Sequence, residues 1–301
     1  MADPARPRWP AIYIVSVVFM SSYVYETLTS LKLEEEEGRL VDKPLVLVVL
    51  PTLGNRSKLF ERALESCASL RDMIPTTVAV IAPVEAGDAR RAARSIGALV
   101  IDDPGTGMAD AFNLGLNART TEDFYVWVGD DDELVPQGVV GLVEALGSDA
   151  TAVLAYGHCD YVDENGSVIG TSKAGLWARF LLSWGPNLIP HPGTVVRLAA
   201  LGEIGGFDPS LRYALDLDVF LRLRAVGRAI FRPVLSARFR WHPDSATVAD
   251  RAASSREAMI VKRRNLPRWI RPVSALWNYP VAWVSSVAAW LVTFRARRLA
   301  S

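Results

Sequence analysis

Hydrophobic residues recur through the middle of the chain in two alternating patterns, continuous apolar runs and amphipathic stretches. The run PLVLVVLPT, residues 44–52, is typical of a strand buried on both faces of a sheet. Residues 57–70 follow with apolar positions at helical spacing, and we expect Ser57 to be the N-cap. The alternation continues, with strands expected at 76–83, 98–103, 124–129 and 152–157 and helices at 85–97, 108–118 and 136–146.

About five repeats of strand and helix predict an α/β domain with a largely parallel central sheet and crossover helices. Beyond Gly157 the pattern loosens into loops and short strands, with one clear helix over residues 216–226. Ligands of open α/β sheets bind beyond the carboxyl ends of the strands. Pro51, Thr52 and the loop after Ile101 stand at such ends, and we expect the functional site there.

Two uncharged apolar segments, residues 9–25 and 272–294, flank this domain. The first is at the short limit for a bilayer span, and the second is long enough. The second contains tryptophans and has arginines on both sides, which favours a segment lying along an anionic membrane surface. The alternative is a C-terminal helical pair folded onto the domain. We divide the chain into an N-terminal apolar segment with an acidic linker (1–43), the central domain (44–247) and a basic, apolar helical tail (248–301).

The overall composition mainly excludes classes of function. Lys and Arg together number 33, as do Asp and Glu, so the formal net charge is zero and nothing indicates a nucleic-acid partner. The two cysteines exclude a disulfide framework and favour a reduced compartment. The three histidines exclude a His-rich zinc site and leave a mixed metal site open.

Three adjacent aspartates, Asp130, Asp131 and Asp132, directly follow the strand expected at 124–129. Like charges repel each other, and burial makes the repulsion more costly. One interpretation is a solvated turn that caps the next helix. The other is a site for a divalent cation, because carboxylate oxygens suit Mg²⁺ or Mn²⁺. The position at the carboxyl end of a strand favours the cation.

The loop DDPGTGMADAFNLG, residues 102–115, is rich in glycine. It lacks the glycine spacing of the dinucleotide-binding fingerprint and the lysine of a phosphate-binding P-loop, so neither an NAD enzyme nor a P-loop NTPase is supported. A glycine loop that leads into a helix can still hold an anion.

Asp216 and Asp218 stand at the start of the helix over 216–226. Acidic residues favour helix N-termini in general. However, these two point about 200° apart on the helix, so one can serve the helix while the other faces a cleft as a possible general base. His191 and His242 each precede a proline, so we expect both in extended loops beside the cleft.

Six segments follow one another along roughly two-thirds of the chain: VLPTLGNRSKLFERALESC, GMADAFNLGL, VGDDDEL, YGHCDYVDENG, HPGTVVR and GGFDPSLRYALDLDVFLRL. Together they resemble the family 2 glycosyltransferases of the GT-A fold, and it is their order that makes the resemblance specific. The segments GMADAFNLGL, VGDDDEL and HPGTVVR are most similar to bacterial members that build polysaccharides and glycolipids.

The resemblance implies a site for a nucleotide-diphospho-sugar donor. Pro51, Thr52 and Arg56 match the start of the family's nucleotide pocket. Asp110 and Asn113 match the helix beside the donor sugar and nucleotide.

The same resemblance places Asp130, Asp131 and Asp132 on the family's DxD region, which binds the donor ribose and, through Mn²⁺ or Mg²⁺, the diphosphate. Asp131 is then the main metal ligand, with Asp132 and His242 as further ligands.

On the acceptor side, Asp216 matches the catalytic base of the inverting members. His191 matches a histidine that lines the active site, and we place Asp218 in the same donor and acceptor pocket.

Four features depart from patterns found in the family. Gly129 stands where the commonest pattern has its first aspartate, and PTLGNR is one residue longer than the usual opening loop. The second strand ends in Pro83 and Val84, where many members carry an aspartate that reads the nucleobase, so the base stays open. The arginine-tryptophan motif of processive synthases is absent, which implies transfer of a single sugar.

The resemblance therefore implies a metal-dependent inverting glycosyltransferase that acts on an acceptor hydroxyl of a cell-envelope glycan or glycolipid. We expect it on the cytoplasmic side of the bacterial inner membrane, in contact with the membrane surface and peripheral or anchored by the terminal segments. One alternative is a non-catalytic GT-A scaffold at a membrane. Another is a sugar-phosphate nucleotidyltransferase, which would want a loop rich in glycine and arginine where PTLGNRSKL stands.

Overall fold

The computed structural model describes residues 46–172, 175–241, 250–274, 276 and 280. The strand and helix alternation expected for the first half is confirmed, with boundaries within a few residues of the prediction. In chain order this half contains β1 (Val46–Pro51), α2 (Ser57–Arg71), β2 (Thr76–Ala82), α3 (Gly87–Ser95), β3 (Leu99–Asp102), α4 (Met108–Asn117), β4 (Phe124–Trp127), β5 (Glu133–Leu134) and α5 (Pro136–Gly147).

The second half is less regular and contains two long strands. Its described elements are β6 (Ala152–Val162), β7 (Val168–Ser172), η1 (Gly175–Trp177), α6 (Ala178–Leu181), β8 (Val195–Arg197), α7 (Leu198–Glu203), α8 (Leu215–Val226), β9 (Arg228–Arg240), α10 (Arg251–Asn265) and η2 (Arg271–Val273).

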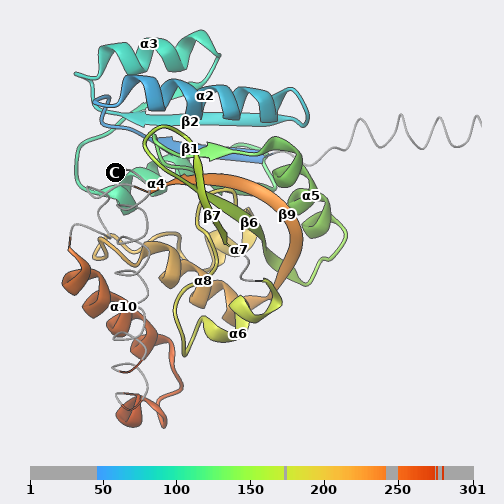
Figure 1. The fold of residues 1–301 in the computed structure, drawn as a ribbon, viewed down its shortest axis with the longest axis vertical. Coiled ribbons are helices and arrows are strands. Elements are labelled where there is room, and N and C mark those ends of the chain that lie inside the picture. The colour runs from blue at the N-terminus through green and yellow to red at the C-terminus, as the bar shows by residue number, and fades with distance from the viewer. Residues whose placement is uncertain (1–45, 173–174, 242–249, 275, 277–279, 281–301) are drawn as a thin grey trace, which may run out of the picture. The chain divides into compact units, whose positions relative to one another are not determined.

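The described strands form one mixed sheet in the order β3-β2-β1-β4-β8-β6-β9-β5, with β7 paired to β6. Strands β3, β2, β1 and β4 pair with one another in parallel, as predicted. The second half adds antiparallel pairs of β4 with β8, β8 with β6, β7 with β6 and β5 with β9, while β6 and β9 are parallel. Figure 1 shows β9 as a long, strongly curved strand beside β6.

Two local expectations need correction. Ser57 is the first residue of α2 rather than its N-cap; Arg56 occupies the cap position, and no side chain caps the helix. The strand expected at 152–157 continues to Val162. Gly157, which marked its expected end, instead lets β9 approach, because a Cβ there would lie 2.3 Å from the carbonyl oxygen of Val234.

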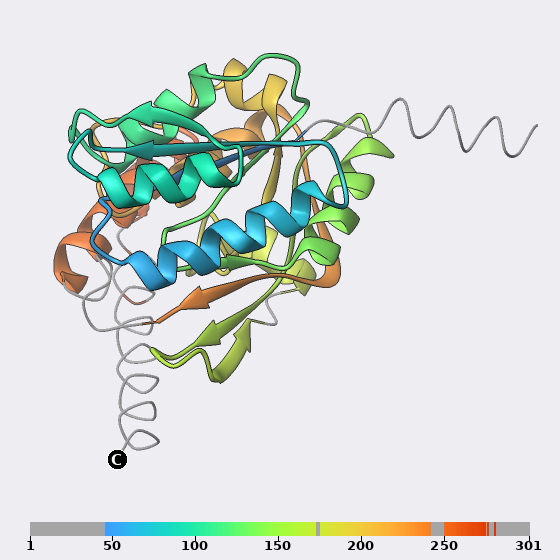
Figure 2. The ribbon, with the colours of Figure 1, turned by 90° about the horizontal axis from the view of Figure 1, so that it is seen from above.

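Each face of the sheet has its own buried core. On one face, side chains from β1, β2 and β4 pack against α2, α3 and α5. On the other face, alternate side chains of the same strands pack against α4, α7 and α8. Figures 1 and 2 show α2 and α3 on the same side of the parallel strands, with α8 and α10 on the other. The parallel strands are therefore covered on both faces, as their continuous apolar runs predict.

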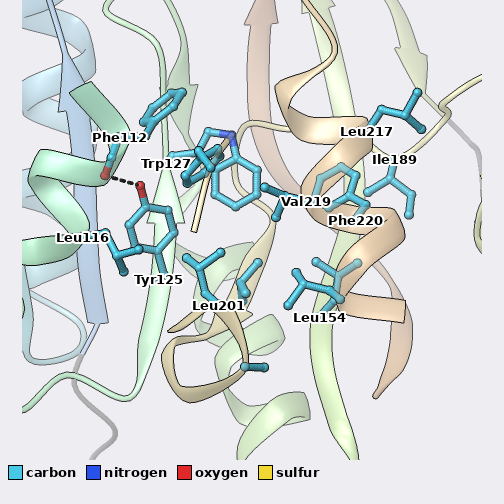
Figure 3. Packing of buried hydrophobic residues seen from close by; sticks show 14 of the residues in the cluster. Phe112, Leu116, Tyr125, Trp127, Leu154, Ile189, Leu201, Leu217, Val219 and Phe220 are labelled. Atoms are coloured by element: carbon cyan, nitrogen blue, oxygen red, sulfur yellow. Dashed lines mark hydrogen bonds between the residues drawn. The ribbon is translucent and has the colours of Figure 1, made fainter. Parts of the chain in front are cut away.

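An aromatic cluster joins the parallel half of the sheet to α8 (Figure 3). The ring of Trp127, the last residue of β4, lies 5.7 Å from the ring of Phe220 in α8 and 5.5 Å from that of Phe207. Tyr125 donates its hydroxyl to the carbonyl oxygen of Phe112 at 3.4 Å. Trp127 stands three residues before Asp130, and Phe220 lies one turn after Asp216. This packing therefore fixes the strand that precedes the aspartates relative to the helix that carries Asp216.

Among the described residues, no helix is both long enough and apolar enough to cross a membrane. The apolar segment 9–25 and most of segment 272–294 fall outside the residues that the structure describes. The apolar terminal extensions, and the division of the chain at residues 43 and 247, therefore stay predictions.

Candidate active site

The candidate residues meet at the edge of the sheet where the parallel strands end. Thr52 follows β1, and the three aspartates follow β4, which pairs with β1 in parallel. Strand β8 runs antiparallel to β4, with Val195 opposite Val126, so the residues just before β8, including His191, lie at the same edge. The sheet thus brings together side chains that are more than 130 residues apart.

Asp130 and Asp131 are held from β1 and the start of α2. The hydroxyl of Thr52 donates to Asp130 Oδ2 at 2.7 Å. Arg56 Nη1 lies 2.5 Å from Asp131 Oδ2 and 3.5 Å from Asp130 Oδ1. One hydroxyl and one guanidinium therefore fix two of the three carboxylates, with both side chains from the loop that the resemblance assigns to the nucleotide pocket.

Asp132 is buried and is held from the other side by the end of β9. The backbone N–H of Arg240 donates to Asp132 Oδ1 at 3.0 Å, and His191 Nε2 lies 3.7 Å from Asp132 Oδ2. The buried guanidinium of Arg240 donates to three carbonyl oxygens, those of Asp131, Asp163 and Glu164, at 3.2, 2.5 and 3.0 Å. Arg240 therefore ties the aspartate turn to the β6–β7 turn.

Two of the three carboxyl groups, those of Asp130 and Asp132, have a raised pKa. Burial is the largest effect on Asp130 and raises its pKa, with Asp131 adding to the rise and Thr52 and Arg56 opposing it. Burial, and next the charge of Asp131, raise the pKa of Asp132 well above its ordinary value. A cation bound among them would favour the charged forms of all three.

Asp216 occupies the opposite side of the site, in the first turn of α8. Burial raises its pKa, while His191 is the largest influence that lowers it. Asn187 Nδ2 donates to Asp216 Oδ2 at 2.8 Å. Burial lowers the pKa of His191, against the charges of Asp216 and Asp131, so this ring is within electrostatic range of both carboxylate groups. Asp216 is thus a partly buried carboxylate with one fixed oxygen.

The structure does not bring Asp218 to this group. Its side chain is fully buried, and its oxygens accept from Arg222 at 2.6 Å and from Arg264 at 2.5 Å. Arg222 also donates to the carbonyl oxygens of Ile204 and Gly206. Of the two acidic residues that start α8, one faces the site and the other anchors the helix, as their opposite directions on the helix require.

Helix α10 holds both segments that position Asp216. One carboxylate oxygen of Glu257 accepts from the backbone N–H groups of residues 212–214, just before α8, at 2.6 to 3.0 Å. Lys262 Nζ donates to the carbonyl oxygen of Gly185, two residues before Asn187, at 2.5 Å. No sequence motif marks either residue, because both act through the backbone of distant loops.

Three other predicted donor residues lie at the same end of the sheet without direct contacts to the aspartates. Pro51 is the buried last residue of β1. Asp110 lies in the first turn of α4, after the glycine loop. Asn113 binds the backbone of Phe207, as donor to its oxygen at 2.8 Å and as acceptor from its N–H at 2.9 Å. Contact of these residues with a donor stays a prediction.

The predicted metal ligands can be assessed only in part. His242 falls outside the described residues, and within those described, no three His, Cys, Asp or Glu side chains are grouped as a ready metal site. Mg²⁺ and similar ions often use only one or two carboxylates, together with waters and substrate phosphates. Asp131 and Asp132 supply the right kind of oxygen for such a site.

Solved structures with the same arrangement of strands and helices include two kinds of protein. TarS 1–349 of S. aureus aligns with a TM-score of 0.53 at 15% identity over 75% of this chain, and its complex with UDP-GlcNAc aligns with 0.56 at 15% identity over 73%. The mannosyltransferase PcManGT from Pyrobaculum calidifontis, in complex with GDP-Man and Mn²⁺, aligns with 0.54 at 18% identity over 96% of this chain and 91% of its own.

This chain spans 68% of TarS 1–349, 65% of the chain in the UDP-GlcNAc complex and 41% of the longer TarS structure. No protein-family model matches the sequence, and no curated protein matches it significantly. At these identities the similarity concerns the fold. The chain has the GT-A fold, as the six sequence segments predicted.

Proposed function

We propose that the protein is a glycosyltransferase that moves one sugar from a nucleotide-diphospho-sugar to an acceptor hydroxyl with inversion at the anomeric carbon. The observation that carries the proposal is the pair of facing carboxylate groups, the triplet after β4 and Asp216 on α8, with His191 near both. The complexes of two GT-A proteins with UDP-GlcNAc and GDP-Man support this class of donor.

On the donor side, we assign Thr52, Arg56 and Asp130 to the nucleoside and diphosphate. Asp131, together with Asp132 and with His242 as the resemblance implies, would hold Mn²⁺ or Mg²⁺. When bound, such an ion supplies positive charge to the leaving diphosphate. Arg56 already balances part of the carboxylate charge, and its guanidinium suits a phosphate oxygen as well as a carboxylate.

On the acceptor side, Asp216 removes the proton from the attacking hydroxyl. The new bond joins the acceptor oxygen to the anomeric carbon, while the bond from that carbon to the diphosphate oxygen breaks. The nucleoside diphosphate leaves with the electron pair, and the proton stays on Asp216 until water takes it. A base is most effective when its pKa lies near the working pH, so the burial that raises the pKa of Asp216 favours this role.

Asn187 gives a test of this base through pH. Its N–H donor favours the charged form of Asp216, so Asn187→Ala should raise the pKa of Asp216 further. The base works only when deprotonated, so the acid limb of kcat/KM should move to higher pH. Asn187→Asp should move it further still, because a second carboxylate would face the first. The acid limb is measured by transfer assays across pH. An unchanged limb in both variants would show that Asn187 does not influence the pKa of the catalytic base.

The direct test of the function is nucleotide release from a panel of nucleotide-sugars, with and without Mn²⁺. We expect turnover of one donor class that is lost when EDTA removes the metal. A panel in which no donor binds, measured by calorimetry, would contradict the donor site itself. Donor binding without turnover, in the presence of lipid and glycan acceptors, would instead favour the non-catalytic scaffold.

We also propose a cell-envelope glycan or glycolipid as the acceptor and the cytoplasmic face of the bacterial inner membrane as the location. Both rest on the apolar segments at residues 9–25 and 272–294. Separation of cell lysates into membrane and cytosolic fractions tests the location.

A further inference from the structure

A short stretch of the domain exposes its largest apolar side chains. Within residues 175–184, Ala178 at the start of α6 and Leu182 directly after it are buried in the core. Trp177 is 73% exposed and Phe180 is 53% exposed, although aromatic side chains of this size are usually largely buried in a soluble domain. We call the exposed set the aromatic patch; it consists of Leu176, Trp177, Phe180, Leu181 and Trp184.

Two arginines accompany the aromatic patch. The guanidinium of Arg179 lies 4.8 Å from the centre of the Phe180 ring. Arg224, in the last turn of α8, donates to the hydroxyl of Ser183 at 3.1 Å, which places it beside the same segment. Burial, and next the positive charge of Arg179, lower the pKa of Arg224, so the two guanidiniums act on each other.

This positive charge is not balanced locally. Among the described residues, neither Arg179 nor Arg224 has a carboxylate partner, and the buried Nε of Arg179 has no hydrogen-bond partner. The sequence contains no Asp or Glu between Glu164 and Glu203. Arg224 is exposed at the surface, so an anionic group outside the protein can complete its surroundings.

The aromatic patch lies close in the chain to the acceptor side of the candidate active site. Trp184 is three residues before Asn187, which binds Asp216. Arg224 and Asp216 belong to the same helix, α8. In Figure 1, α6 is drawn near α8 and away from α2 and α3, and the contact of Arg224 with Ser183 joins the two segments.

We propose that the aromatic patch, with Arg179 and Arg224, is a docking surface for a lipid bilayer that contains anionic headgroups. Tryptophan and phenylalanine partition into the headgroup region, and arginine side chains bind lipid phosphates while their stems lie along apolar surface. The unbalanced arginines favour an anionic bilayer over a second copy of this chain, because a second copy would bring the same uncompensated charge to the contact. The proposal rests on residues 175–184 and Arg224 and does not depend on sugar transfer.

The test uses the full chain with one reporter on the patch. Phe180→Cys is labelled with a fluorophore whose emission shifts to the blue in an apolar environment, and Leu99→Cys, on the edge strand β3, is the control. The native Cys67 and Cys159 are buried, and burial raises the pKa of both thiols to about 12, so they react slowly. Vesicles of phosphatidylcholine with phosphatidylglycerol are compared with vesicles of phosphatidylcholine alone.

We expect a blue shift at position 180, and none at position 99, with the vesicles that contain phosphatidylglycerol. Arg224→Gln should reduce the shift, while Arg94→Gln, an exposed arginine on α3, should leave it unchanged. This readout reports the patch even if other segments also bind the membrane. The proposal would be overturned if the protein sediments with the vesicles but the label at position 180 shows no blue shift. An equal shift with phosphatidylcholine alone would also overturn it, as would a shift without vesicles that grows with protein concentration, which would indicate self-association.

Discussion

Asp216→Asn is expected to lower the rate of sugar transfer by about 10²–10⁴-fold, the usual contribution of a general base, while donor binding stays near that of the wild type. The amide keeps the shape of the side chain, but it cannot accept the proton of the acceptor hydroxyl. The triplet at residues 130–132 belongs to another element and is left intact. Single-turnover transfer and calorimetric titration of the donor measure the two quantities separately.

The same variant should be at least as stable as the wild type. The pKa of Asp216 is raised in the folded protein, so its protonated form is favoured there, and the stability it contributes is lost as the pH rises through that pKa. At neutral pH the charged carboxylate therefore costs folding free energy, and the neutral amide removes the cost. A higher melting temperature with lost activity is the signature of a functional residue.

Asp218→Asn is the matched control, two residues away on the same helix. Its carboxylate is fully buried, while the side chains of Arg222 and Arg264 are 23% and 37% exposed. Loss of its charge therefore costs less than the about 3–5 kcal/mol of a fully buried pair, because solvent screens the two arginines. We expect a clear fall in the melting temperature, with transfer by the folded fraction largely kept. Transfer by Asp216→Asn at the wild-type rate, or equal loss of transfer in the two variants, would contradict the assignment of Asp216 as the base.

The parallel half of the fold was predictable because its signals are local. Strands β1, β2 and β4 are continuous apolar runs, since helices cover both of their faces. The opposite directions of Asp216 and Asp218 also followed from local geometry, because they depend only on the spacing of the two residues. The placement of Asp218 in the donor and acceptor pocket did not, since Asp218 is buried against Arg222 and Arg264. The spacing alone does not show which of Asp216 and Asp218 points toward the site. That depends on how the helix packs, through the contact of Phe220 with Trp127.

The second half depends on contacts between distant residues, which a single sequence does not display. Gly157 resembled the end of a strand, yet it lies inside β6 because the carbonyl of Val234 approaches it closely. Arg240 and Asn187 carry no motif, and each matters through one partner far along the chain, Asp132 and Asp216 respectively. Their roles become visible only once β9 and the loop before β8 are placed.

Gly129, where the commonest family pattern has an aspartate, has a physical reason in this chain. A Cβ at this position would lie 3.0 Å from Asp131 Oδ1 and 3.0 Å from Asp132 Oδ2. A side chain here would press on both carboxylates. The triplet therefore starts one residue later than the common pattern, and Asp131 stands at its centre.

Asp131→Asn is expected to reduce transfer by at least about 100-fold, since a bound metal ion contributes several kcal/mol to the stabilisation of a leaving diphosphate. The amide is a weaker metal ligand than the carboxylate, and it can accept from Arg56 without carrying the negative charge that pairs with this guanidinium. Loss of this charge also removes a repulsion that raises the pKa of Asp130 and of Asp132. In the absence of metal and donor, the variant should therefore be as stable as the wild type. Transfer at saturating donor, Mn²⁺ binding by calorimetry and the melting temperature measure these three effects.

Asp160→Asn is the control for the loss of one carboxylate near the site. Its side chain accepts from Thr171 on β7 rather than joining the triplet, so transfer and Mn²⁺ binding should both stay at the wild-type level. Wild-type protein in EDTA should show the same loss as Asp131→Asn, and added Mn²⁺ should restore only the wild type. If Asp131→Asn keeps both its rate and its dependence on Mn²⁺, the metal is held by other residues. If EDTA leaves the wild-type rate unchanged, the positive charge at the diphosphate comes from the protein, and Arg56 is the residue placed to supply it.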